Sequence, residues 1–261
     1  MKDSRRYGVD LCYGTCMIDR CLETIQYWEE GLDGNALFKK VITEASIPGT
    51  KHSTYEHFVR EFFSHRFLTQ EGLMWTRVLK RYAHIMSRAC IVQIMYLLSA
   101  RFDPMIRDFV LTTYWPRVKK GEFFFPSSTA FDFLVAAAQE GRPGAIGSEC
   151  SLKKNSSGIN GICLGYGLWR RQNKNGYLAT PIIVHSNVIP LLACELHDRG
   201  LSDEAVIRHL DWALLGMNRE DVLAELRSSR FTNVFLCQSN SNLVSISWKM
   251  TMMEAAARYG K

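Results

Sequence analysis

The chain has 261 residues and is 47% hydrophobic and 22% charged, the balance of an ordinary globular protein with one or two domains. No apolar run approaches the roughly 20 residues of a membrane span, and the polar start has no signal-peptide pattern, so a cytoplasmic protein is expected. The net charge of +6 favours a polyanionic partner.

Six amphipathic helices are predicted in the first 120 residues, because apolar residues recur there at helical spacing. They lie within 15–30, 37–45, 53–63, 75–82, 85–98 and 103–114. Asp103 is expected to cap the last helix, with Pro104 as its first residue and Pro116 closing it. Short loops between these helices predict a bundle, which we assign to an N-terminal domain of residues 1–120.

A different pattern follows between residues 121 and 178. A short strand is expected at 121–125, then a helix after Ser127 and Ser128, a break at 141–144 and a second helix that starts at Ser148. The segment 169–177 begins with an apolar residue, continues with basic residues and turn-forming residues, and ends with an aromatic residue. This order is typical of a two-stranded wing. Together these elements predict a winged helix-turn-helix-like module.

This module also concentrates positive charge, with six Lys and Arg against one acid between Arg142 and Lys174. Such a surface suits the phosphates of double-stranded DNA, although an ordinary helical hairpin with a solvated charged edge remains an alternative. Trp169 would either contact nucleic acid or anchor the wing to the second helix. The DNA-binding candidates here are Lys153, Lys154, Asn155, Ser156, Asn160, Arg170, Arg171 and Lys174, and a second possible patch holds Lys51, Arg60 and Arg66.

The C-terminal part is expected to continue the module in one α+β domain, residues 121–261. Its helices would start near Asn187, Ser202 and Asn218, and residues 250–259 would form a last short helix. Residues 232–238 and 243–248 alternate with a period near two, which predicts a β-hairpin. The expected fold class is therefore mainly α: an N-terminal helical bundle, a winged helix-turn-helix-like module, and C-terminal helices with a small β-hairpin.

Signatures of catalysis are missing from the sequence. It has no phosphate loop, no GxSxG or HExxH motif and, among its eight cysteines, no CxxC pair. No enzymatic activity, cofactor, metal site or small-molecule substrate is expected.

The order of short motifs resembles the BrxA family, a component of bacterial BREX phage-defence systems. The resemblance covers nearly the whole chain and rests on YWEEGL at 27–32, TE at 43–44, KHST at 51–54, REFFSHRF at 60–67, FDPMIRDFV at 102–110, ELHDRGLS at 195–202 and WALLGM at 212–217, before a hairpin that ends in Trp248. It implies a mostly helical, non-enzymatic protein that binds DNA beside other BREX components. The leading hypothesis is therefore a protein that binds double-stranded DNA, and no membrane partner is expected, because no apolar run is long enough to span a membrane.

Two other functions stay open at this point. The eight acids between Glu195 and Glu225 would make a docking face if the chain were an interaction scaffold, and a basic helical bundle can also bind RNA. If DNA is bound, little sequence selectivity is expected, because basic residues outnumber residues that read base edges. The glycines at 158, 161, 165 and 167 also make the second helix a poor rigid probe.

Overall fold

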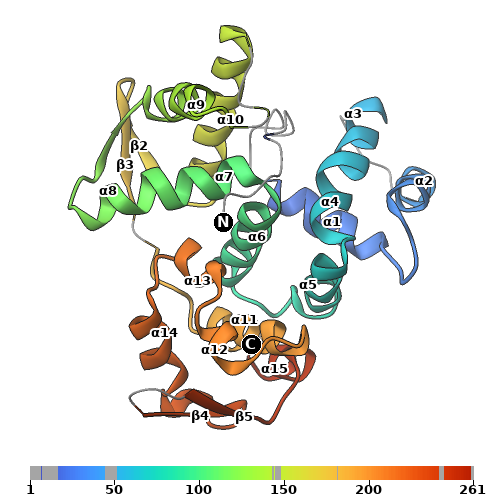
Figure 1. The fold of residues 1–261 in the computed structure, drawn as a ribbon. Helices are drawn as coiled ribbons and strands as arrows, with labels where there is room; N and C mark the ends of the chain where they lie inside the picture. Colours follow the sequence, from blue (N-terminus) through green and yellow to red (C-terminus); the bar gives the residue numbers. More distant parts are fainter. Residues whose placement is uncertain are drawn as a thin grey trace. The chain divides into compact units, whose positions relative to one another are not determined.

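The fold is known from a computed structural model, which describes residues 7, 17–44, 52–142, 144, 148–180, 182–240 and 244–259 (Figure 1). It is mainly helical, with two small antiparallel sheets in the described ranges. No single helix there is long and apolar enough to cross a membrane.

Contacts divide the chain into two compact units that are not sequential. Unit 1 comprises residues 1–17 and 99–183, and unit 2 comprises residues 18–98 and 184–261. This division differs from the expected boundary at residue 120. The reason is the aromatic core of unit 1, where Tyr114 stacks on Phe125 and its hydroxyl donates to the Leu168 carbonyl at 2.7 Å. The helical residues 99–119 thus complete the hydrophobic core of the strands that follow.

Unit 2 contains two groups of helices and one hairpin. The first group is α1 (Ile18–Tyr27), α2 (Gly34–Glu44), α3 (His52–His57), η2 (Phe58–Phe63), α4 (Ser64–Phe67), α5 (Gln70–Tyr82) and α6 (Arg88–Phe102), whose last turn belongs to unit 1. The second is α11 (Val188–Asp198), α12 (Asp203–Ile207), α13 (Leu210–Leu214), α14 (Arg219–Leu226), η4 (Ser229–Phe231), β4 (Phe235–Ser239), β5 (Val244–Trp248) and α15 (Met252–Tyr259). These elements confirm the predicted helices and the C-terminal hairpin.

Local capping explains where several of these helices begin. Ser202 accepts a hydrogen bond from the backbone of α12, and Asn218 forms a capping box with Asp221 at the start of α14, as predicted. Asp203 accepts from the Ile246 amide at 2.8 Å and from Trp248 Nε1 at 3.0 Å. One carboxylate thereby ties α12 to strand β5.

Unit 1 contains α7 (Pro104–Phe109), η3 (Val110–Tyr114), α8 (Trp115–Lys119), β1 (Phe124–Pro126), α9 (Thr129–Gln139), α10 (Glu149–Gly165), β2 (Trp169–Asn173) and β3 (Gly176–Ala179). Asp103 caps α7 by accepting from the amides of Met105 and Ile106, and Pro104 is its first residue, as expected. The prediction that Pro116 closes this helix is wrong, because the helix continues through α8 to Lys119. The π-helical segment η3 precedes Pro116, and its wider turn accommodates a residue that has no amide hydrogen to donate.

Candidate nucleic-acid interface

The candidate site is built on the part of unit 1 that runs in the order α8, β1, α9, α10, β2, β3. Its three strands are antiparallel in the order β1-β3-β2, so the first strand pairs with the last and β2 is an edge. Residue pairs run across all three strands, with Phe124 opposite Leu178 and Leu178 opposite Arg170. The hairpin β2–β3 follows directly on helix α10.

Helix α10 has well-defined ends. Ser148 caps it by accepting a hydrogen bond from the Ser151 amide, as the sequence predicts. Gly167, with φ of +73°, follows its last turn in a conformation that favours glycine. The helix is continuous between these ends despite Gly158 and Gly161.

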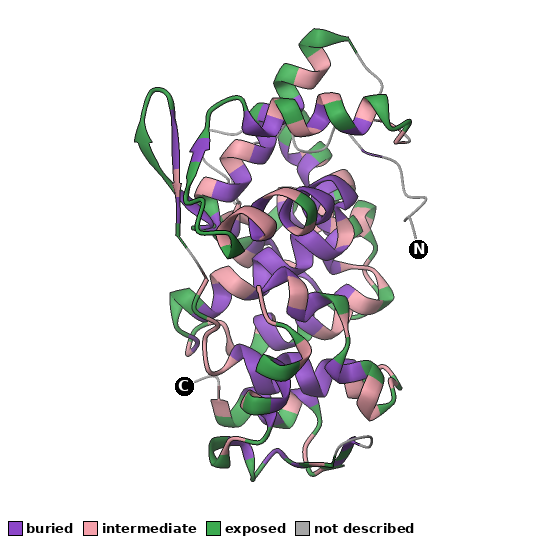
Figure 2. Cartoon of the chain, turned by 60° about the vertical axis from the view of Figure 1, so that its left-hand side comes forward, coloured by how far each residue is buried: buried purple, intermediate pink, exposed green. Residues whose placement is uncertain are grey.

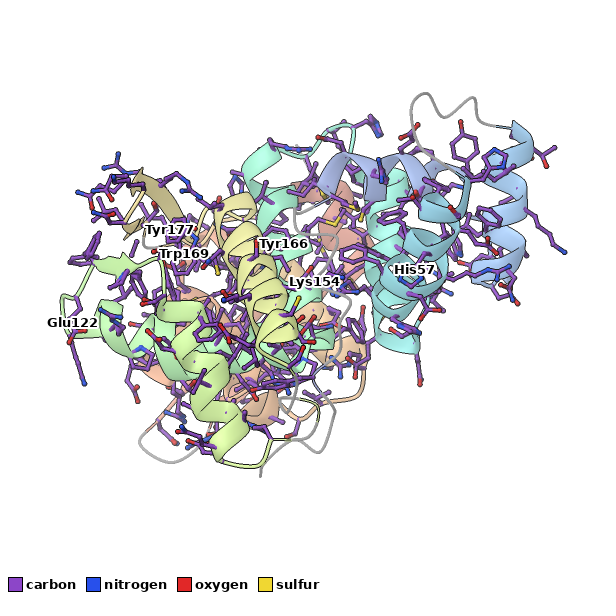
Figure 3. The ribbon with its side chains drawn as sticks, turned by 90° about the horizontal axis from the view of Figure 1, so that it is seen from above. His57, Glu122, Lys154, Tyr166, Trp169 and Tyr177 are labelled. Atoms are coloured by element: carbon purple, nitrogen blue, oxygen red, sulfur yellow. The ribbon has the colours of Figure 1, made fainter. Side chains whose placement is uncertain are left out.

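Trp169 anchors the base of the hairpin. It is 1% exposed, and its ring stacks on Tyr177 with centroids 4.8 Å apart (Figure 3). Its Nε1 donates to the Asn160 carbonyl of α10 at 3.3 Å. Of the two interpretations that the sequence left open, the structure therefore supports anchoring, and a contact between Trp169 and nucleic acid is wrong for this buried ring.

The hairpin carries three exposed cations beyond this anchor. All four residues of β2 after Trp169 are exposed, and they include Arg170 and Arg171. Lys174 is exposed in the turn that follows β2. Figure 2 shows the exposed residues of this hairpin in green. The Arg171 guanidinium lies over the Tyr177 ring, 5.3 Å from its centroid. No carboxylate in the described parts of the chain forms an ion pair with any of the three.

The two lysines of α10 differ in their electrostatic surroundings. Lys153 Nζ forms an ion pair with Glu149 Oε1 at 2.6 Å, one turn earlier in the helix. Their hydrogen bond holds the pKa of Glu149 below its usual value and raises the pKa of Lys153. Lys154 is exposed and has no such partner among the residues described. Lys154 is thus the α10 cation whose charge is not offset locally.

The polar candidates on α10 are less accessible than expected. Asn155 and Ser156 are only 7% and 8% exposed, and Asn160 is half-buried. The structure therefore takes Asn155 and Ser156 out of the exposed basic surface. They face inward because α10 packs one side against α9 and β2.

The second possible patch is not assembled as the sequence suggested. Arg66 is 4% exposed, and its Nη1 donates to the Phe62 carbonyl while its guanidinium stacks 4.0 Å from the Phe62 ring centroid. Arg60 is exposed but forms an ion pair with Glu56 at 2.8 Å. Lys51 lies outside the described residues. A buried arginine cannot reach a phosphate on the surface, so Arg66 is wrong as a surface contact.

The charge of the chain is divided unequally between the two units. Unit 1 has 14 Lys and Arg against eight Asp and Glu, whereas unit 2 has 18 of each. The whole net charge of +6 therefore belongs to the unit that holds the hairpin. Sequence reasoning missed two exposed cations of unit 1, Lys119 and Lys120 at the end of α8. Their position beside Gly121, a residue that ends helices, was the available signal.

The acidic segment of unit 2 is used mostly within the fold. Glu195 is fully buried and lies 3.4 Å from Arg199, and Glu204 pairs with Arg208 and Arg219. Three other acids accept hydrogen bonds from backbone amides: Asp198 from Met252, Asp203 from Ile246 of β5, and Asp221 from Asn218 in the capping box. Glu225 forms an ion pair with Arg230. These contacts leave little free negative charge for a docking face.

The described residues hold no group of three or more His, Cys, Asp or Glu side chains placed to bind a metal ion. Comparison with protein-family models, with curated proteins and with solved structures finds no match to this chain.

Proposed function

We propose that unit 1 is a winged helix-turn-helix module that binds double-stranded DNA, with α9 and α10 as its helix pair and β2–β3 as its wing. The order of elements supports this proposal, since two consecutive helices are followed by a basic hairpin. The width of α10 suits the major groove, which admits an α-helix. The wing would lie beside it along the phosphate backbone.

The observation that carries the proposal is a set of exposed cations without acidic partners on the unit that holds all of the net charge. The set, which we call the wing cations, consists of Lys154, Arg170, Arg171 and Lys174. Side chains of this kind contribute to DNA affinity by replacing the counterions that surround the phosphates. Lys153 is a weaker contributor, because Glu149 competes with phosphate for its ammonium group.

Binding by these residues would be only weakly selective for sequence. Phosphate contacts fix the register of a protein on DNA but do not read bases. Asn155 and Asn160, the amides that could read adenine from α10, are buried or half-buried, which is consistent with phosphate contacts as the main source of affinity.

The resemblance to the BrxA family supports a non-enzymatic, accessory role for this binding. By that resemblance, the chain would act with other BREX components in a bacterial defence system against phage. Co-purification of a tagged chain with the other components from one operon would test this role separately from DNA binding. Recovery of the tagged chain alone would argue against it.

A titration with nucleic acids tests the proposed function directly. Fluorescence anisotropy with duplex DNA, single-stranded DNA and duplex RNA, each at low and at moderate salt, should give the tightest binding to duplex DNA and a steep loss with salt. Preference for RNA would instead favour the first group of helices in unit 2, α1 to α6, as the binding part. No binding to any of the three would favour the interaction scaffold, for which the internally paired acids of unit 2 offer little support.

A further inference from the structure

One face of the three-stranded sheet is open. Paired residues in antiparallel strands point to the same face, so Phe124, Leu178 and Arg170 form one row across the sheet. The neighbouring row contains Phe125, Tyr177 and Arg171, and its two aromatic rings are buried in the core. The first row therefore lies on the outer face, away from the core of unit 1.

This outer face exposes aromatic surface at its β1 edge. Phe124 of this row is 42% exposed, and Leu178 is half-buried. Phe123, also 42% exposed, lies one residue before β1, and by the alternation of strand side chains it points to the opposite side of this edge. Most large apolar side chains of the described residues are buried, so two adjacent exposed phenylalanines are unusual.

Local contacts of Arg117 hold this edge in place. Arg117 reaches back from α8, where its Nε pairs with Glu122 at 3.1 Å and its Nη2 donates to the Phe124 carbonyl at 3.2 Å. Its guanidinium lies 4.7 Å from the Phe125 ring centroid. The carboxylate of Glu122 is therefore already neutralised by Arg117.

The cations next to the aromatic edge have no such partner. Lys119 and Lys120 are exposed shortly before Phe123 in the chain, and Arg170 is exposed in the same row as Phe124. No ion pair joins any of these three cations to an acid in the described ranges. A ligand that complements this edge therefore has flat, apolar groups and also negatively charged groups.

We propose that the outer sheet face binds unpaired nucleotides of a single DNA strand. The surface, which we call the aromatic ledge, consists of Phe124, Leu178 and Arg170 on this face, together with Phe123, Lys119 and Lys120, which precede β1 in the chain. Bases stack on the phenylalanine rings while phosphates contact the cations, the combination by which proteins hold single strands without reading sequence. The inference deepens the proposed function and rests on it: the protein prefers a duplex that is flanked by an unpaired strand.

A second copy of this chain fits the aromatic ledge less well than nucleic acid does. Two copies joined by this face would bring together two units with a net charge of +6 each and no free carboxylate at the edge. Like charges set opposite each other oppose association. The charge distribution therefore selects the anionic occupant.

The experiment compares a short blunt duplex, the same duplex with an oligo-dT tail, and free oligo-dT, each fluorescently labelled, by anisotropy at one fixed salt concentration. The wild-type chain should bind the tailed duplex more tightly than the blunt one. Replacement of both phenylalanines (Phe123→Ala with Phe124→Ala) should remove this advantage, a loss of about tenfold or more, and leave blunt-duplex binding unchanged. Phe124→Tyr keeps a ring that can stack and should keep the advantage.

Leu236→Ala provides the matched control, because Leu236 is 40% exposed on a strand of unit 2 and is equally apolar. It should leave all three affinities unchanged. Circular dichroism and thermal unfolding of each variant separate loss of the ledge from loss of the fold.

The outcomes distinguish this inference from the proposed function. Tight blunt-duplex binding without a tail advantage, or an advantage that survives in the double variant, overturns the aromatic ledge and leaves the proposed function standing. Binding to oligo-dT that depends on the phenylalanines, with no binding to blunt duplex, overturns the proposed function and keeps the ledge as a single-strand site. A dimer in sedimentation velocity that the double variant abolishes assigns the face to a second copy and overturns the inference.

Discussion

Removal of the wing cations should change the salt dependence of DNA binding in a calculable way. The variant replaces Lys154, Arg170, Arg171 and Lys174 by Ala, and none of these four side chains pairs with an acid in the described structure. Each phosphate that a protein neutralises contributes about 0.9 to the slope of log affinity against log salt concentration. If all four contact phosphate, the slope becomes shallower by about 3.6.

The size of this effect makes it easy to measure. Between about 50 and about 200 mM salt, a slope difference of about 3.6 corresponds to a loss of affinity about 150-fold greater for the wild type than for the variant. Anisotropy of a labelled duplex across a salt series gives both slopes. Several duplexes of unrelated sequence should lose affinity alike, because the contacts that are removed carry no base information.

A variant with the same loss of charge elsewhere provides the control. Lys39, Arg81, Arg88 and Arg258 are exposed cations of unit 2, and their replacement by Ala should leave the slope nearly unchanged. If the wing variant keeps the wild-type slope while the control variant flattens it, the assignment of the DNA surface to unit 1 is refuted. If both keep it, the affinity does not come from exposed cations of either set.

Three further predictions follow from contacts in the same module. Trp169→Ala should lower the free energy of unfolding in urea by about 3–5 kcal/mol, because it removes a fully buried indole, and an unchanged denaturation midpoint would refute the anchoring role. Glu149→Gln should steepen the salt slope by about 0.9, since Lys153 then becomes free to contact phosphate; an unchanged slope would show that Lys153 does not reach the DNA. Gly176→Ala should destabilise the sheet by about 1–3 kcal/mol in the same urea measurement, because a Cβ there would lie 2.5 Å from the Phe125 carbonyl oxygen, and wild-type stability would contradict this close approach.

The sequence predicts the elements of this fold better than their grouping. Helical spacing and capping residues such as Asp103, Ser148 and Asn218 act within a few residues, so the positions of many helices and both hairpins can be predicted from local pattern. Which helices share a core depends on contacts between distant residues. Tyr114 meets Leu168 across more than fifty residues, and nothing local in either segment reveals this.

The candidate site could be predicted in its charge but not in its accessibility. The density of Lys and Arg between residues 142 and 174 is visible in the sequence, and Arg170, Arg171 and Lys174 are indeed exposed. Asn155 and Arg66 look equally polar in sequence, yet both are buried. Whether such a group is buried depends on which side of its helix packs against the rest of the protein, and polarity alone does not reveal this. Arg66, for example, is buried with its guanidinium stacked on Phe62.

The unequal division of charge between the two units also affects how fast the chain would find a polyanion. The field of a nucleic acid attracts unit 1, with its net charge of +6, and on balance exerts no pull on unit 2. Electrostatic steering of this kind raises association rate constants by about 10- to 1,000-fold at low ionic strength, and the gain falls steeply as salt is added. An encounter would therefore begin with unit 1 turned toward the phosphates, before any contact selects a position along the strand.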